Sequence, residues 1–380
     1  MTQQNPGTAG VQVCSLTGSL PLACGKDLDG VRIAYETWGT LDERATNAVL
    51  ICHALSGDCH VAGKAPDLGW WSAMVGPGKP IDTDRFFVIC SNVLGGCSGT
   101  TGPGSLDPIT GRPYGLRFPL VTIEDMVDAQ AALLDTLGIR RLVAVVGGSL
   151  GGMQALAWAR RYPERVASCV ASATTWRLTA QAIAFNEVGR QAILGDPDFS
   201  HGDYGPATPP ALGLAIARMI GHITYLSADS MRSKFGRRLQ ERSEHAFDFV
   251  TEFEVESYLA HQGRKFVERF DANTYLYMTK AMDYFDLAQG ANSLEAAFAA
   301  PSTRFLVLSF SSDWLFPTHQ SRELVDALRR VGAEVSFAEI ESSFGHDSFL
   351  LETETQAEFM TPFLERTLEQ ERQAAGGEEA

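Results

Sequence analysis

A doubly wound α/β fold with a mostly parallel sheet is the fold class that the 380-residue sequence predicts. Three observations lead to this prediction. Short apolar runs recur along the chain, helical patterns lie between several of them, and a Gly-x-Ser-x-Gly segment directly follows one run. Uninterrupted apolar runs are typical of strands buried on both faces, and their alternation with helices indicates a parallel sheet covered by helices.

The predicted strands are six apolar runs, at residues 48–52, 86–90, 142–146, 166–170, 305–310 and 335–340. A helix is predicted over residues 122–137, because Thr122 and Asp125 have the spacing of a capping box and Gly138 can end the helix. Another helix should follow the Gly-x-Ser-x-Gly segment and end near Tyr162.

The alternation of strands and helices stops after about residue 173 and resumes near residue 302. The stretch between has helical character, with the clearest helical spacing of apolar residues at 212–226 and 253–270. We therefore expect a core domain of residues 1–174 and 302–380, interrupted by a helical lid domain of residues 175–301. The first ten residues and the tail from about Glu369 are polar or small, and we expect them to be frayed.

Composition and charge narrow the class of protein. With 45% hydrophobic and 20% charged residues, the chain can bury a large core. A net charge of -15 without a clustered Lys/Arg run argues against a nucleic-acid partner. The first residues lack a cationic start and an apolar stretch, and no apolar run reaches the length of a membrane span. We therefore expect a cytoplasmic protein with no membrane partner.

The seven cysteines are odd in number and form no CxxC pair, which argues against a disulfide framework. Cys52-His53 and Cys59-His60 superficially suggest a metal site. The first pair, however, ends a predicted buried strand and the residues between the pairs form a predicted loop, so we expect no metal.

The segment GGSLG at residues 147–151 follows the predicted strand 142–146 and has the form of a nucleophile elbow. In such a turn the serine, here Ser149, adopts a strained backbone, and the flanking glycines leave room for it. The following helix would direct its N-terminal amides at developing negative charge. The motif alone is also compatible with an ordinary strand-to-helix turn.

An acid and a histidine follow later predicted strands in the chain order that an α/β-hydrolase fold requires. His346 would take the proton of Ser149, and Asp313 would hold the imidazole. The backbone amides of Leu55 and Leu150 would stabilise the oxyanion. Singly, Asp313 could be a loop cap, His346 a surface histidine and Leu55 a core residue, but their joint order predicts an α/β-hydrolase fold with a helical lid insertion.

These residues predict acyl transfer through a serine ester. They leave open whether water or another acceptor removes the acyl group, because hydrolases and transferases share the first half-reaction. A noncatalytic binding module on the same fold is a further alternative, which the intact set of serine, aspartate and histidine argues against.

From about residue 20 to residue 365 the chain resembles the homoserine O-acyltransferases of methionine biosynthesis. The resemblance is carried by AYETWG at 34–39, CHALSG at 52–57, NVLGGC at 92–97, TGP at 101–103, GGSLGGMQ at 147–154 and ITYLS at 223–227. It implies transfer of an acyl group from acyl coenzyme A to the hydroxyl of L-homoserine by a ping-pong route through acyl-Ser149. The resemblance also implies a homodimer formed through the helical lid.

The resemblance further implies that Arg218, Tyr225 and Asp347 bind the substrate. Arg218 and Tyr225 are seven residues apart and so share one helix face. Arginine suits the homoserine carboxylate, and Asp347 suits the ammonium group. Without the family, Arg218 could be a snorkelling side chain, Tyr225 a core aromatic residue and Asp347 a helix cap.

The resemblance further implies that the acyl donor depends on the position two residues after the catalytic aspartate, here Asp313. Relatives that use a succinyl donor tend to carry an arginine there, whereas this chain has Leu315. Leu315 offers no charge for a second carboxylate, so we expect acetyl-CoA as co-substrate, with no bound cofactor. A homoserine O-succinyltransferase, a serine O-acyltransferase and a serine carboxylesterase or thioesterase remain alternatives.

Overall fold

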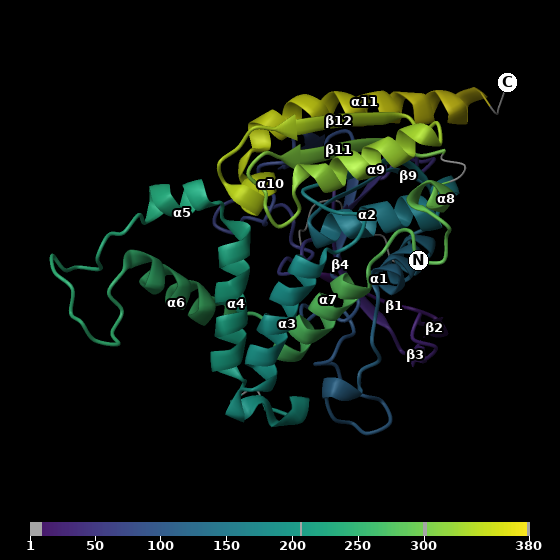
Figure 1. Cartoon of the computed structure of the whole chain (residues 1–380). Helices are drawn as coiled ribbons and strands as arrows, with labels where there is room; N and C mark the ends of the chain where they lie inside the picture. Colours follow the sequence, from purple (N-terminus) through teal and green to yellow (C-terminus); the bar gives the residue numbers. More distant parts are fainter. Residues whose placement is uncertain (1–9, 206, 299–301, 378–380) are drawn as a thin grey trace.

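Parallel strands form the centre of the fold in the computed structural model, which describes residues 10–205, 207–298 and 302–377 (Figure 1). All six predicted strands are present and lie side by side in one sheet. In the order of the sheet they are β8 (Phe87–Ser91), β5 (Ala48–Cys52), β9 (Leu142–Gly148), β10 (Val166–Ser172), β11 (Arg304–Phe310) and β12 (Val335–Ile340).

Two antiparallel strands that the sequence analysis did not predict extend this sheet. They are β4 (Arg32–Trp38), which pairs with β8, and β1 (Gln12–Ser15), which forms the edge. β4 mixes charged, polar and apolar residues, so it lacks the uninterrupted apolar run by which the other strands were identified. Two small sheets pair β2 (Ser19–Pro21) with β3 (Asp27–Asp29) and β6 (Val75–Gly76) with β7 (Ile81–Asp82).

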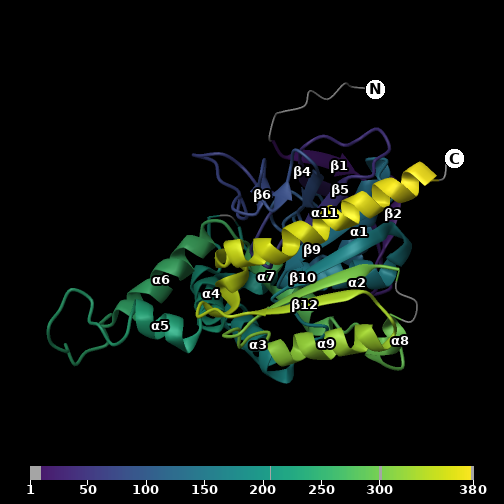
Figure 2. The ribbon, with the colours of Figure 1, turned by 90° about the horizontal axis from the view of Figure 1, so that it is seen from above.

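Helices cover both faces of the sheet, and successive residues of β5 alternate between the two resulting cores. Leu50 belongs to the core under α1 (Ile123–Thr136), α2 (Leu150–Arg161) and α9 (Thr318–Arg330). Its neighbours Val49 and Ile51 belong to the core under the long helix α11 (Thr353–Gly377), which crosses the sheet in Figure 2. The fold class is therefore the predicted one, a mostly parallel sheet flanked by helices.

The predicted start of α1 is confirmed in detail. The Asp125 amide donates to the Thr122 hydroxyl, and the Asp125 carboxylate accepts from the Thr122 amide at 2.8 Å, which completes a capping box. The helix ends before Gly138, whose φ of 74° is a conformation that glycine adopts without strain.

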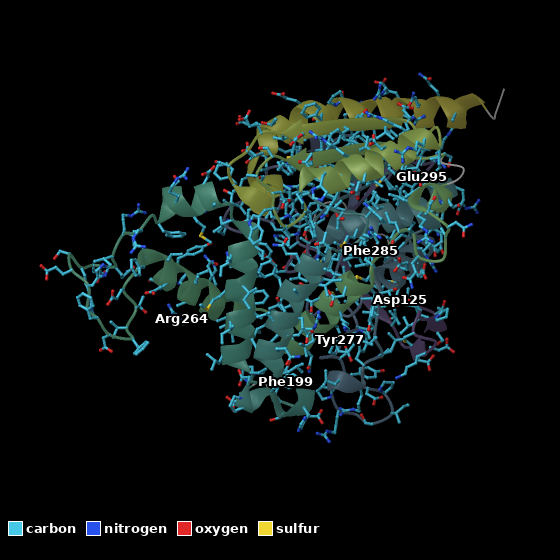
Figure 3. All side chains as sticks on the ribbon, in the orientation of Figure 1. Asp125, Phe199, Arg264, Tyr277, Phe285 and Glu295 are labelled. Atoms are coloured by element: carbon cyan, nitrogen blue, oxygen red, sulfur yellow. The ribbon has the colours of Figure 1, made fainter. Side chains whose placement is uncertain are left out.

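Between β10 and β11 the chain is mainly helical, as predicted. The helices there are α3 (Ala180–Leu194), α4 (Ala211–Tyr225), α5 (Ala228–Lys234), α6 (Glu254–Val267), α7 (Ala272–Tyr284) and α8 (Leu294–Ala297). α5, the loop of residues 235–253 and α6 project from the rest of the chain (Figure 1). α7 packs against α3, and the Tyr277 hydroxyl, labelled in Figure 3, donates to the Phe118 carbonyl in the loop before α1 at 2.5 Å.

Short helical segments complete the described chain: α10 (Ser348–Leu351), η1 (Gly115–Arg117), η2 (Pro163–Arg165), η3 (Pro197–Gly202) and η4 (Gly345–Asp347). Among the described residues, no single helix has the length and apolar character needed to cross a membrane. α4 and α5 pass that test only as a pair, and they are bent by 105°.

The expectation of a frayed tail from Glu369 is wrong for the part of the tail that is described. α11 continues to Gly377, because Leu368 is fully buried against the sheet and the Glu371 carboxylate accepts from Arg141 Nε at 2.6 Å. These contacts come from β9 and its preceding turn, so the composition of the tail alone does not predict them. The expectation for the first ten residues lies, apart from Gly10, outside the described residues.

Candidate active site

Ser149 lies at a sharp turn between β9 and α2 and is 7% exposed. Its φ of 58° and ψ of -124° form a conformation that costs a non-glycine residue about 1–3 kcal/mol. Two hydrogen bonds hold this backbone. The Ser149 amide donates to the Ser172 carbonyl at 3.1 Å, and the Thr174 hydroxyl donates to the Ser149 carbonyl at 2.8 Å. The turn has the strained geometry of a nucleophile elbow.

Close backbone contacts require glycine on both sides of this turn. A Cβ atom on Gly147 would lie 2.1 Å from the Gly151 carbonyl oxygen, and a Cβ atom on Gly151 would lie 2.0 Å from the Cys52 carbonyl oxygen. Neither backbone atom can move away without displacing a central strand or the start of α2. The contact between Gly151 and Cys52 also brings the chain after β5 next to the first residue of α2.

The structure brings Ser149, His346 and Asp313 together in one hydrogen-bonded line. The Ser149 hydroxyl lies 2.8 Å from His346 Nε2, and His346 Nδ1 lies 2.8 Å from Asp313 Oδ2. The other oxygen, Asp313 Oδ1, accepts from the amides of Leu315 at 3.0 Å and Phe316 at 2.9 Å. A carboxylate accepts hydrogen bonds only, so Nδ1 carries the imidazole proton and Nε2 is free to accept the serine proton.

The turn between α4 and α5 holds the loops that carry the acid and the histidine. Gly345 has a φ of 75°, and a Cβ atom there would lie 2.5 Å from the Ser227 amide nitrogen. The Ser227 hydroxyl donates to the Ser343 carbonyl in the same loop. On the acid side, the Trp314 indole N–H donates to the Leu226 carbonyl at 3.0 Å. The helical insertion therefore supports the histidine and aspartate loops directly.

Opposing effects set the pKa of His346. Burial lowers its pKa, but the negative charge of Asp313, the hydrogen bond to Asp313 and the charge of Asp347 together outweigh burial. The pKa of His346 is therefore raised above its usual 6.5. This shift favours the imidazolium that forms when His346 takes a proton from Ser149.

The two predicted oxyanion amides flank the serine from different elements. Leu150 is the first residue of α2, and Leu55 lies in the turn after β5. Within residues 10–205, 207–298 and 302–377, neither amide donates to a protein acceptor. Both are therefore available to a bound oxygen, and the Leu150 amide adds the positive end of the helix dipole.

His53 is a buried residue of the site that the sequence analysis considered only as a metal ligand. Its ring spans two backbone groups: Nδ1 donates to the Ala54 carbonyl at 2.8 Å, and Nε2 accepts from the Val93 amide at 3.1 Å. Burial lowers the pKa of His53, so the ring is neutral and can make both contacts. A histidine at the end of a buried strand could have indicated this structural role. Its partner Val93 lies far along the chain, so the sequence does not identify the contact.

Arg218 and Tyr225 share one face of α4, as their spacing predicted. The Arg218 guanidinium carbon lies 5.6 Å from the centre of the Tyr225 ring, which lies 5.9 Å from the centre of the His346 ring. Arg218 Nη1 also donates to the Ser56 hydroxyl at 3.4 Å, while its buried Nε has no partner among the described residues. Arg218 therefore reaches the edge of the serine site.

Asp347 directly follows His346 in η4 and is half-buried. Burial raises the pKa of the Asp347 carboxyl above its ordinary value, although the nearby charges of His346 and Arg218 oppose that rise. Arg218 and Asp347 therefore face the same region with opposite charges, and no direct ion pair joins them among the described residues.

A small pocket of about 40 Å³ opens onto Ser149. Leu315 lines it, and no lysine or arginine does so in the described part of the chain. The other lining residues are mainly apolar or aromatic and include Leu55, Leu178, Ala182, Phe185, Ile220, Tyr225, Tyr275, Met282 and Phe316. The pocket therefore favours an uncharged acyl group.

The cysteine and histidine pairs have protein partners of other kinds. The Cys52 thiol lies 3.8 Å from the Gln130 side chain, and His60 Nδ1 lies 2.9 Å from the buried Glu36 carboxylate. All seven cysteines are free. Across the described residues, no group of three or more His, Cys, Asp or Glu side chains is arranged to hold a metal ion.

The family described as alpha/beta hydrolase fold matches residues 47–353, and the chain belongs to this family. A homoserine O-acetyltransferase of Solidesulfovibrio magneticus is 56% identical over 363 residues, which cover 94% of this chain and 91% of that protein. A homoserine O-acetyltransferase of Methanohalobium evestigatum is 53% identical over 372 residues, which cover 97% of this chain and 76% of that protein. Within the α/β hydrolases, the chain thus belongs to the homoserine O-acetyltransferase family.

Two solved structures show how widely the fold is used. A homoserine O-acetyltransferase from Bacillus anthracis matches with a TM-score of 0.88 at 29% identity, over 94% of this chain and 98% of that chain. Esterase E22 matches with a TM-score of 0.86 at 30% identity, over 94% of this chain and 100% of that chain. The fold therefore accommodates both a transferase and an esterase, and the site must distinguish them.

The raised pKa of His346 generates a prediction for the acid limb of the pH profile. A general base must be neutral, so acylation of Ser149 should slow as the pH falls through a midpoint above the usual 6.5. Single-turnover release of p-nitrophenol from p-nitrophenyl acetate, followed from pH 5 to 9, measures this midpoint. A midpoint at or below 6.5 would contradict the raised pKa of His346, and a rate that does not fall at low pH would contradict its assignment as the base.

The variant Asp347→Asn tests how much the charge of Asp347 contributes to the raised pKa of His346. It removes one carboxylate near His346 and leaves Asp313 in place, so the midpoint should move to lower pH. Unchanged release at high pH would show that the variant still forms the site.

Proposed function

We propose that this chain transfers an acetyl group from acetyl-CoA to the hydroxyl of L-homoserine, giving O-acetyl-L-homoserine for methionine biosynthesis. The observation that carries the proposal is the identity of 56%, over 94% of the chain, to a protein named homoserine O-acetyltransferase. The hydrogen-bonded serine, histidine and aspartate support it, together with Arg218 of the insertion and Asp347 beside His346. The proposed route is ping-pong, with acetyl-Ser149 as the intermediate.

In the first half-reaction, the Ser149 oxygen attacks the thioester carbon while His346 Nε2 takes the hydroxyl proton. Asp313 stabilises the resulting imidazolium through the bond to Nδ1, at 2.8 Å in the resting state. The amides of Leu55 and Leu150 stabilise the tetrahedral oxyanion. The carbon–sulfur bond then breaks, and His346 returns its proton to the leaving thiolate, which departs as coenzyme A.

In the second half-reaction, the homoserine hydroxyl takes the place of the thiol. His346 accepts the hydroxyl proton as the homoserine oxygen attacks the acetyl carbon, and it then returns that proton to Ser149 as the acyl bond to serine breaks. The same two amides stabilise the second oxyanion. One base and one oxyanion site thus serve both halves of the reaction.

The proposed acceptor site uses three side chains around His346. Arg218 would bind the homoserine carboxylate and Asp347 the ammonium group. The Tyr225 ring contacts both residues: its centre lies 5.6 Å from the Arg218 guanidinium carbon and 5.9 Å from the centre of the His346 ring. Such a spacing supports an acceptor whose carboxylate is held away from the base while its hydroxyl reaches it.

Acetyl is the proposed acyl group because Leu315 and its neighbours line the serine pocket with apolar surface. A succinyl group would place a second carboxylate there without a cation to bind it, and such a burial is unfavourable. The related alternative of L-serine as acceptor differs by one methylene group, which is worth about 1–3 kcal/mol in a binding site.

A serine esterase or thioesterase is the alternative from another class. It is favoured by the match to esterase E22 at a TM-score of 0.86, since an esterase would use the same triad with water as acceptor. The small and mainly apolar pocket favours the transferase, because a site that excludes water protects the acetyl-enzyme until an amino acid binds.

We also propose a domain division, an oligomeric state and a location for the chain. Residues 1–174 and 302–380 would be the core domain, and residues 175–301 the lid domain. The projecting arm of α5, loop 235–253 and α6 supports a homodimer formed through the lid, because Phe247 and Phe249 at its tip are 94% and 108% exposed. A cytoplasmic location is proposed because both substrates are small metabolites.

Release of free coenzyme A tests the proposed reaction. The purified chain should release it from acetyl-CoA rapidly with L-homoserine, and much more slowly with L-serine or without an acceptor, because only homoserine fits the proposed site. Ser149→Ala is the control and should lower the rate by several orders of magnitude. Equal release with and without homoserine would make the chain a hydrolase instead.

Leu315→Arg tests the donor specificity. The new guanidinium should pair with the free carboxylate of succinyl-CoA, so the ratio of kcat/KM for succinyl-CoA to that for acetyl-CoA should rise by about tenfold or more, as one charge-assisted hydrogen bond allows. Leu315→Met is the matched control of similar volume without charge, and it should leave the ratio unchanged. An equal loss with both donors in Leu315→Arg would contradict the assigned role.

The mass in solution tests the proposed dimer. Light scattering should give twice the chain mass of 41.2 kDa, and the double variant Phe247→Asp with Phe249→Asp should give a single chain mass. Ile109→Asp is a matched control, because Ile109 is 92% exposed and lies outside the arm, in the segment before η1. A single chain mass for the unsubstituted protein would exclude the dimer.

A further inference from the structure

The turn after β5, here called the oxyanion turn (residues 53–57), contains a chain of hydrogen-bonded peptide groups that ends at the Leu55 amide. The Ala54 carbonyl accepts from the Gly57 amide at 3.0 Å and from His53 Nδ1 at 2.8 Å. The Ala54 carbonyl and the Leu55 N–H belong to one planar trans peptide and point in opposite directions. The two bonds accepted by Ala54 therefore set the direction in which the Leu55 N–H points.

The next peptide group continues this chain in the same way. The Gly57 N–H, which donates to Ala54, belongs to the same peptide as the Ser56 carbonyl. That carbonyl accepts from Arg269 Nη1 at 2.9 Å. A continuous line of donors and acceptors thus runs from the Arg269 guanidinium through two peptide groups to the Leu55 N–H.

Arg269 belongs to the helical insertion, between α6 and α7, and not to the strand or loop that it contacts. Its guanidinium carbon lies 5.4 Å from the centre of the buried Phe266 ring, while that of Arg218 lies 4.6 Å from the same ring. Both arginines also contact Ser56, Arg218 through the hydroxyl and Arg269 through the carbonyl. Two arginines of the insertion therefore contact the oxyanion turn at the same residue, Ser56.

The positive charge of Arg269 favours acyl transfer, because it strengthens a hydrogen-bond donor to the developing oxyanion. A hydrogen bond from a guanidinium is stronger than one from a neutral donor, and hydrogen bonds in a line polarise one another. Among the described residues no carboxylate lies within ion-pair distance of Arg269, and Asp58 acts on its charge only from farther away. Polarisation of both peptides makes the Leu55 N–H a better donor to a developing oxyanion.

We propose that Arg269 is a positioning residue for the reaction, which orients and polarises the Leu55 amide through the Ser56–Gly57 and Ala54–Leu55 peptides, so that the helical insertion completes the oxyanion site. The inference rests on the serine acyl chemistry of the proposed function. It does not depend on which acceptor removes the acyl group.

The test measures the acylation rate of Ser149 by p-nitrophenyl acetate in the first turnover, a step that needs neither coenzyme A nor homoserine. Arg269→Gln keeps an N–H donor but removes the charge, and Arg269→Lys keeps the charge. Complete loss of an oxyanion donor costs about 10²–10³ in rate, so Arg269→Gln, which weakens the donor without removing it, should slow acylation about tenfold. The ester concentration at half-maximal rate should change by less than about twofold, because the ground state does not use the oxyanion site.

Arg269→Lys should recover most of the rate lost in Arg269→Gln, because an ammonium group can donate to the Ser56 carbonyl. Arg264→Gln is the matched control, since Arg264 is exposed on the neighbouring helix α6 (Figure 3), and it should acylate at the unsubstituted rate. Thermal unfolding of each variant shows whether the fold is retained.

Acylation of folded Arg269→Gln at the unsubstituted rate would overturn the inference. Equal slowing in the glutamine and lysine variants would also overturn it, because that pattern indicates a steric role without charge. Failure of the proposed function would look different: coenzyme A release would not depend on homoserine, while the comparison of Arg269 variants with the ester would still give its result.

Discussion

The strained backbone of Ser149 is the constraint on which the rest of the site depends. Its φ of 58° is held by bonds to Ser172 and Thr174, and it is possible only because glycines flank the turn. The same requirement shapes the neighbourhood, because Gly151 lies against the Cys52 carbonyl and so brings the oxyanion turn beside the first amide of α2. One tight turn thus determines where the Ser149 hydroxyl points and how close the oxyanion turn lies to the first amide of α2.

The helical insertion is part of this site and not only a cover for it. It contacts the acid loop through Trp314 and Leu226, the histidine loop through Gly345 and Ser227, and the oxyanion turn through Arg269. Movement of the insertion would therefore disturb three elements of the reaction together. This coupling gives a physical reason why chemistry would be restricted to the state in which the acceptor site is also formed.

Transferases and esterases share this fold, so the fold alone does not select the acyl acceptor. The match to esterase E22 shows that the sheet, the elbow and the overall topology do not decide which molecule receives the acyl group. In the proposed function that choice would depend on the surroundings of the acyl-enzyme: the apolar pocket beside Leu315, and the opposite charges of Arg218 and Asp347. The insertion supplies Arg218 to these surroundings, whereas Leu315 and Asp347 come from the loops after β11 and β12.

The sequence by itself determined the parallel strands, the elbow at Ser149 and the candidate acid and histidine, because each is encoded in a local pattern: an apolar run, glycines at a sharp turn, or a polar residue after a strand. It did not determine β1 and β4, whose residues lack a continuous apolar run, or the helical tail, which depends on Arg141 and the sheet. Only the tertiary structure decided the contacts of His53 and Arg269. The partners of both side chains are backbone groups whose direction is set by the fold. His53 contacts the Val93 amide and Arg269 contacts the Ser56 carbonyl, and each pair is far apart in the sequence. No local spacing in the sequence therefore predicts these contacts.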